Sequence, residues 1–282
     1  MGQLYEFLRE NPTGTGWRWD LEKPRRRRPN AQTWTQRLNL NRGTYNVPKE
    51  FDPECDPSFI QVEDQGQIGS CAGNANTSCG EICNRNESGE YPQFSRMGAY
   101  LLAQEKDGLL GSDSGSTIES NLEVAEEGYC FESTFPYPSS YTSRIPSAAR
   151  RERIYQLPGA MPITDSKTLF DWILTNQGPV YIGMRWTRMM DEQDVIKDFF
   201  GPRRNDRHGG GHSVFFYGWT TIADEFCPWL WNSWSRRWGR DGRKPISRSA
   251  FDQIFTDNFT RCFGFRWRQQ PEVEDWSKLR FI

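Results

Sequence analysis

The chain has 282 residues, of which 35% are hydrophobic and 26% are charged, and its formal net charge is −2 at pH 7. This length suits one to two domains. No apolar stretch approaches the roughly 20 residues that a membrane-spanning helix needs, so we expect no membrane partner. Residues 1–10 lack the apolar core of a secretory signal, which predicts a cytoplasmic or assembly-associated protein.

The chain divides near Val47 into a basic arm and an acidic body. Residues 1–46 hold nine basic and four acidic residues, a formal charge of +5, whereas the rest of the chain carries −7. The run of four arginines at 25–28 fits a solvated linker, a docking arm on an acidic surface, a maturation site or nucleic-acid contact. A nucleic-acid partner is the least expected of these. We hypothesise that the arm packs against the body or a neighbouring subunit, as a short pro-segment or a tether.

Three stretches after the arm predict helices, which form a first, helical lobe over about residues 60–155. They lie at residues 70–84, 95–104 and 117–127. The first has no proline and places small or apolar residues at three- and four-residue spacing. The third is amphipathic and ends at Gly128.

A second lobe, over about residues 156–282, is predicted to be mainly antiparallel sheet. A helix at 167–176 comes first, and β-prone runs follow at residues 179–184, 213–219, 229–232 and 261–267. The fold class is therefore predicted to be α+β. A site built from both lobes lies in the cleft between them.

Cys71 is the candidate nucleophile. It begins the first predicted helix, whose amide dipoles favour a thiolate at the first turn. Gly66 and Gly69 allow the preceding loop to turn tightly, so the side-chain amide of Gln65 can lie beside the backbone N–H of Cys71. Two such donors make an oxyanion hole for acyl transfer.

His212 is the candidate base. The chain contains only two histidines, and His208 lies in a polar, glycine-rich loop, whereas His212 begins an apolar, β-prone run. Asn232 follows a second apolar run that can pair with the first, which brings its amide to the imidazole and fixes the ring. Trp234 is placed to shield that hydrogen bond from water.

The other cysteines are interpreted as small buried hydrophobes. They are Cys55, Cys79, Cys83, Cys130, Cys227 and Cys262. Cys79 and Cys83 lie one helical turn apart, but no second Cys or His pair accompanies them. We therefore expect neither a metal site nor another cofactor.

Taken in chain order, these motifs resemble the papain-like cysteine peptidases. The matching segments are Gln65 with Gly69-Ser70-Cys71, Gln177-Gly178-Pro179-Val180, Gly211-His212-Ser213-Val214, Asn232-Ser233-Trp234 and Trp238-Gly239-Arg240-Asp241-Gly242. The resemblance also includes Asp113-Ser114-Gly115-Ser116 and Glu132-Ser133-Thr134-Phe135-Pro136-Tyr137, and the latter segment resembles bacterial and viral members more than plant or lysosomal ones. The resemblance covers residue 47 to the C-terminal region.

The resemblance implies a two-lobed papain-like fold in residues 47–282. It also implies a cysteine endopeptidase that cleaves polypeptides through an acyl-enzyme intermediate at Cys71, His212 and Asn232. Gly115 would lie along the substrate cleft, where its bare backbone pairs with an extended peptide. Two positions depart from the family pattern: Ile68 replaces a disulfide-bonded cysteine, and Ala72 replaces a tryptophan. One family disulfide should therefore be absent and the wall of the site reshaped.

Two other functions remain open at this point. A papain-fold subunit of a virion or other large assembly, no longer catalytic, would retain the site and use the basic arm as a tether. An amidase acting on cell-wall peptides would share the Cys-His chemistry. The Asn-Ser-Trp segment favours the peptidase.

Overall fold

The computed structural model describes residue 18 and residues 60–174, 178–200 and 210–266. Several of the predictions above concern positions outside the described residues. These are the division at Val47, the arginine run, Cys55, Gln177 and His208.

The helical lobe contains all three predicted helices. In the part of the chain that the structure describes, its helices are α3 (Cys71–Ser88), α4 (Arg96–Asp107), α5 (Ile118–Glu127) and α6 (Ser147–Arg151). The side chains of Ser95 and Thr117 cap α4 and α5 by accepting a backbone N–H from the first turn. The short helix α6 was not predicted, since five residues give no readable period.

The second lobe is built on one antiparallel sheet. Its strands are β1 (Ala160–Pro162), β2 (Val180–Arg185), β3 (Gly211–Ile222), β4 (Glu225–Trp231), β5 (Arg243–Pro245) and β6 (Arg261–Phe265). They lie in the order β1-β6-β2-β3-β4-β5. The same lobe also contains α7 (Ser166–Leu174), α8 (Arg188–Glu192) and α9 (Arg248–Phe255). The predicted α+β class and antiparallel lobe are confirmed.

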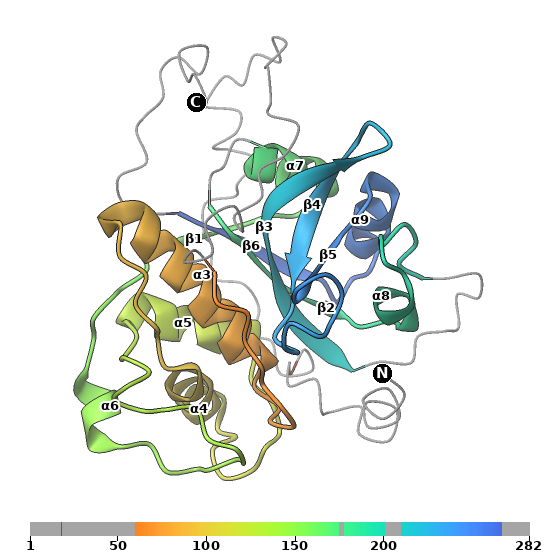
Figure 1. Cartoon of the computed structure of the whole chain (residues 1–282). Helices are drawn as coiled ribbons and strands as arrows, with labels where there is room; N and C mark the ends of the chain where they lie inside the picture. Colours follow the sequence, from red (N-terminus) through yellow and green to blue (C-terminus); the bar gives the residue numbers. More distant parts are fainter. Residues whose placement is uncertain (1–17, 19–59, 175–177, 201–209, 267–282) are drawn as a thin grey trace.

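Both faces of the sheet are buried, which explains why its strands are apolar runs and do not alternate with polar residues. Tyr181, Phe215 and Trp231 share a hydrophobic cluster with α3 on one face. Ile182 and Phe216 point the other way, into a cluster with α7 and α9. Figure 1 shows α3 lying between the sheet and the other helices of its lobe. The nucleophile helix is therefore part of the main core.

The β3–β4 hairpin brings the predicted base and its amide partner to the same end of the sheet. Phe215 is paired with Trp231 near that end, and a two-residue turn at Ala223 and Asp224 closes the other end. Both turn residues have positive φ, 49° and 62°, as a tight hairpin requires. The predicted pairing of these two apolar runs is confirmed.

A short pairing joins the two lobes beside the site. Gln65 donates its backbone N–H to the Ser233 carbonyl at 2.8 Å, and Ser235 donates to the Glu63 carbonyl at 2.9 Å. The loop before α3 is thus tied to the segment after β4. Among the described residues, none forms a helix that is both long enough and apolar enough to cross a membrane.

Candidate active site

Cys71 is the first residue of α3, so the N-terminal amides of an 18-residue helix lie beside its thiol. Ser70 precedes it and is held from within the helix, because the Asn74 side chain donates to both its carbonyl (3.0 Å) and its hydroxyl (2.9 Å). Gly89 ends the helix in the left-handed conformation that favours glycine. The predicted start of the helix is confirmed.

His212 and Asn232 meet as predicted. His212 Nε2 lies 2.9 Å from Asn232 Oδ1, and the same oxygen accepts the Ser233 backbone N–H at 2.8 Å. Asn232 is fixed at the end of β4 by its own N–H, which donates to the Gly242 carbonyl at 2.9 Å. This hydrogen bond fixes the orientation of the imidazole ring.

The thiol of Cys71 contacts the strand that carries the imidazole. The backbone N–H of Ser213, the residue after His212, lies 3.4 Å from Cys71 Sγ. The Tyr181 hydroxyl of β2 donates to the Ala72 carbonyl at 3.1 Å, which fastens the first turn of α3 to the same sheet. These two contacts therefore hold the first turn of α3 against the sheet, next to the strand that carries His212.

Both Cys71 and His212 are 0% exposed. Burial raises the pKa of the Cys71 thiol to about 12, although the amides of Ser213 and Ala72 favour the thiolate. Burial of the thiol therefore disfavours the thiolate in this conformation.

Gln65 is buried beside these residues, and its side-chain amide has a fixed orientation. Its Oε1 accepts the Ser233 hydroxyl at 2.7 Å, and its Nε2 donates to the Ile68 carbonyl at 2.9 Å. An amide nitrogen carries two hydrogens, so one remains for a bound oxyanion. Gly66 adopts φ +56° in this turn, which favours glycine.

Trp234 packs on the His212 ring with the ring centroids 4.6 Å apart. The sequence reasoning missed Trp186, whose centroid lies at the same distance from His212 at an angle of 78°. Asp191 holds that indole, since its carboxylate accepts the Nε1–H groups of Trp186 and Trp238, both at 3.1 Å. Trp186 follows the end of β2, and its backbone N–H donates to the Gly210 carbonyl just before β3. Its position beside His212 therefore follows from the pairing of β2 with β3, which the sequence does not show.

Gly115 has φ +81°, and its backbone groups are engaged within the protein. Its N–H donates to the Tyr100 hydroxyl at 3.0 Å, and its carbonyl accepts from Gln104 Nε2 at 3.1 Å. Pairing with a substrate peptide remains a prediction for this residue. The next carbonyl, of Ser116, accepts the backbone N–H of Arg18 at 2.9 Å.

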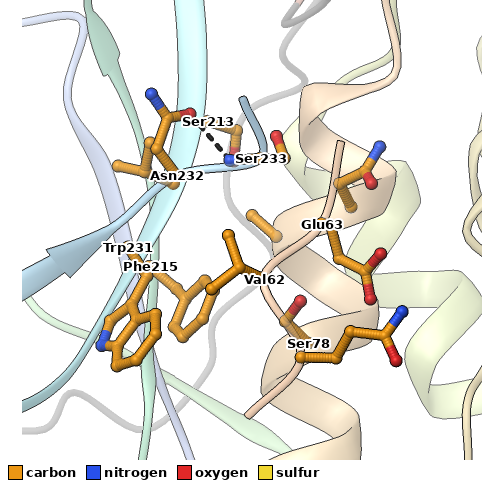
Figure 2. Close-up of a pocket in the computed structure, with 12 residues that line it drawn as sticks. Val62, Glu63, Ser78, Ser213, Phe215, Trp231, Asn232 and Ser233 are labelled. Carbon is orange, nitrogen blue, oxygen red and sulfur yellow. Dashed lines mark hydrogen bonds between the residues drawn. The ribbon is translucent and has the colours of Figure 1, made fainter. Parts of the chain in front are cut away.

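A small cavity lies behind Asn232, between the lobes. Figure 2 shows Asn232, Ser213 and Ser233 on its sheet side and Glu63 and Ser78 opposite. Its volume of about 10 Å³ suits a single water-sized sphere. It is too small for a substrate side chain.

The cysteines in the described part of the chain are all buried: Cys71, Cys79, Cys83, Cys130, Cys227 and Cys262. The buried interpretation is confirmed for Cys79, Cys83, Cys130, Cys227 and Cys262, whereas Cys55 lies outside the described residues. Ile68 is 2% exposed and packs with Met97 and Tyr100, in place of a disulfide. Within residues 60–174, 178–200 and 210–266, no three His, Cys, Asp or Glu side chains form a metal-binding group.

This fold, with a cysteine at a helix start facing a His–Asn pair on a sheet, defines a class of cysteine peptidases. The chain matches the model of the papain family cysteine proteases over residues 47–257 and belongs to that family. It is thus a papain-like cysteine peptidase, as predicted. No curated protein matches the chain in sequence.

Solved structures of the same fold include xylellain, a cysteine protease from Xylella fastidiosa. It is 20% identical, has a TM-score of 0.67, and the match covers 91% of this chain and 97% of that one. Digestive procathepsin L 3 of Tenebrio molitor is 19% identical, with a TM-score of 0.65 and coverage of 93% and 78%. Bromelain from Ananas comosus, solved with the E64 inhibitor, is 14% identical, with a TM-score of 0.61 and coverage of 79% and 100%.

Proposed function

We propose that the protein is an endopeptidase that hydrolyses polypeptides through Cys71, His212 and Asn232. The observation that carries this proposal is the joint placement of the three residues. His212 Nε2 lies 2.9 Å from Asn232 Oδ1, and the next residue on the same strand donates its N–H to Cys71 Sγ at 3.4 Å. A nucleophile, a base and a group that orients the base are the parts that covalent amide hydrolysis needs.

In the first half-reaction the Cys71 sulfur bonds to the carbonyl carbon, and the carbonyl oxygen takes the negative charge. Gln65 Nε2 and the Cys71 backbone N–H donate to that oxygen. His212, protonated by the thiol, gives its proton to the leaving amine as the C–N bond breaks, which leaves a thioester. Water then attacks the thioester, His212 accepts its proton, and the Cys71 thiol is restored as the carboxylate leaves.

Alkylation and hydrolysis test this assignment together. We expect iodoacetamide to modify Cys71 faster than the other cysteines, and Cys71→Ala to hydrolyse none of a fluorescently labelled denatured protein. Cys130→Ala is the matched control, since Cys130 is also buried in the helical lobe. Hydrolysis by Cys71→Ala at the wild-type rate would refute the role of Cys71.

The closed state of the site supports a second candidate, a papain-fold subunit of a larger assembly that no longer cleaves peptides. Both reacting side chains are fully buried, and burial keeps the thiol protonated. If Cys71 is alkylated no faster than Cys130 and no labelled protein is cleaved, the non-catalytic role is favoured.

We propose that residues 1–46 act as a short pro-segment on the helical lobe. The hydrogen bond from Arg18 N–H to the Ser116 carbonyl supports this, because Ser116 follows Gly115, the predicted peptide-binding residue. We expect a chain that lacks residues 1–46 to alkylate at Cys71 faster than the full chain. Equal alkylation rates and equal thermal stability in the two chains would refute the pro-segment.

A further inference from the structure

One carboxylate connects the loop before Cys71 to the loop that contains Gly115. Both oxygens of Asp113 lie 3.0 Å from the backbone nitrogen of Gly69 and accept its N–H. Gly69 lies between Gln65 and Cys71, the two proposed oxyanion donors. The position of this loop therefore depends on Asp113.

Tyr100 on α4 fixes Asp113 in turn. Its hydroxyl oxygen accepts the Gly115 N–H at 3.0 Å and Gln104 Nε2 at 2.9 Å, and lies 2.7 Å from Asp113 Oδ1. A phenol has one hydrogen and two lone pairs. Because both lone pairs are used, the hydrogen goes to Asp113, and Asp113 accepts with both oxygens, as an ionised carboxylate does.

Gln104 completes the network from one helical turn further along α4. Its Nε2 also donates to the Ser112 carbonyl at 2.9 Å, and its Oε1 accepts the Tyr141 hydroxyl at 2.9 Å. Tyr100 and Gln104 are both fully buried. The two hydrogens of Gln104 Nε2 are shared among the Tyr100 hydroxyl and the Ser112 and Gly115 carbonyls, so this buried network ties Asp113 and Gly115 to α4.

We propose that Asp113, held by Tyr100, is a positioning residue that fixes Gly69 and thereby aligns the oxyanion donors of the loop from Gln65 to Cys71. This inference rests on the proposed function of that loop. The Asp113 charge also opposes the thiolate, because after burial it adds to the rise in the Cys71 pKa. Removing the Asp113 charge should therefore weaken a reaction of Cys71 that needs the oxyanion donors, and should not slow a reaction that needs only the thiolate.

A peptide aldehyde and iodoacetamide separate those effects. With the aldehyde, the Cys71 sulfur bonds to the carbonyl carbon, and the thiol proton passes to the oxygen of the hemithioacetal, which occupies the oxyanion position. With iodoacetamide, the sulfur displaces iodide at a saturated carbon, and no oxyanion forms. Only the first reaction reports on the placement of the oxyanion donors.

We expect Asp113→Asn to weaken aldehyde binding about tenfold, since the amide NH2 that replaces one carboxylate oxygen is a donor and cannot accept the Gly69 N–H. The alkylation rate of Cys71 should stay equal or rise. Tyr100→Phe removes the donor to Asp113 and the acceptor of the Gly115 N–H without a charge change, so aldehyde binding should weaken at least about threefold at an unchanged alkylation rate. Asp107→Asn is the matched control, because Asp107 accepts the Thr117 N–H and hydroxyl in the same lobe; it should alter neither reaction.

Aldehyde binding and alkylation that fall equally in Asp113→Asn, or aldehyde binding that does not change, overturn the inference. If that variant does not fold, as judged by thermal melting, the threefold effect in Tyr100→Phe decides. A wild-type chain that binds the aldehyde but cleaves no labelled protein refutes the peptidase function alone. A wild-type chain whose Cys71 binds no aldehyde overturns both proposals.

Discussion

Replacing Asn232 by alanine removes the acceptor that holds the imidazole of His212, the proposed base. His212 Nε2 lies 2.9 Å from Asn232 Oδ1, and the ring is 0% exposed, so the substitution removes a fully buried hydrogen bond. Loss of one partner of a buried hydrogen bond costs about 1–3 kcal/mol. In transition-state terms this is roughly a 5- to 150-fold fall in kcat/KM.

The surrounding indoles place the expected loss toward the lower end of that range. Trp234 and Trp186 each pack against the His212 ring at 4.6 Å, so the ring stays in place even when its hydrogen bond is gone. We therefore expect Asn232→Ala to retain measurable activity, about 5- to 20-fold below the wild type. Asn232→Asp should move the basic limb of the pH profile to higher pH, because a carboxylate stabilises the imidazolium.

The assay is kcat/KM for a fluorogenic peptide between pH 5 and pH 9, with thermal melting to verify folding. Asn84→Ala is the control, since the Asn84 side chain also makes two hydrogen bonds, here as the donor, but lies half-buried near the C-terminal end of α3, away from the site. A loss in Asn232→Ala that is under twofold, or that equals the loss in Asn84→Ala, would refute the assigned role.

Three further changes have defined outcomes. Burial raises the pKa of Glu63 to about 7 from an ordinary 4.5. The protonated Glu63 therefore contributes its full stability below about pH 4.5, and this contribution is lost as the pH rises through 7. The urea midpoint of the wild type should fall over this pH range, and Glu63→Gln should make that fall smaller. Gly264→Ala places a methyl group 2.4 Å from the Trp172 ring, so it should destabilise the fold by about 1–3 kcal/mol in urea unfolding, and an unchanged midpoint would contradict the packing. Trp186→Leu removes one wall of His212, so kcat/KM should fall roughly 2- to 10-fold; wild-type activity would show that the wall is dispensable.

The catalytic candidates could be predicted because local signals mark them. Cys71 begins a helix without proline, and His212 and Asn232 border two apolar runs that form one hairpin. Helix α9 also carried a readable signal, since Ser247 caps it and Ala250 and Phe251 begin its buried face, yet it was overlooked. Strands β1 and β5 have three residues each and give no period to detect.

Trp234 was predicted from its place two residues after Asn232, but the other supports of the site could not be predicted, because they depend on contacts between distant segments. Trp186 reaches His212 only through the register of β2 on β3. Asp113 meets Gly69 across 44 positions of sequence, and nothing near either residue indicates the other. The full burial of Cys71 is likewise a property of the assembled lobes.

The shared core around α3 has a consequence for how the protein loses function. Cys71 belongs to the same hydrophobic cluster as Ile82 of α3 and Phe215, Trp231 and Phe263 of the sheet. No local fraying can therefore separate the reacting atoms while that cluster stays packed. On heating, we expect enzymatic inactivation and global melting to coincide at one temperature. A partly unfolded chain that retains an intact active site should not be populated.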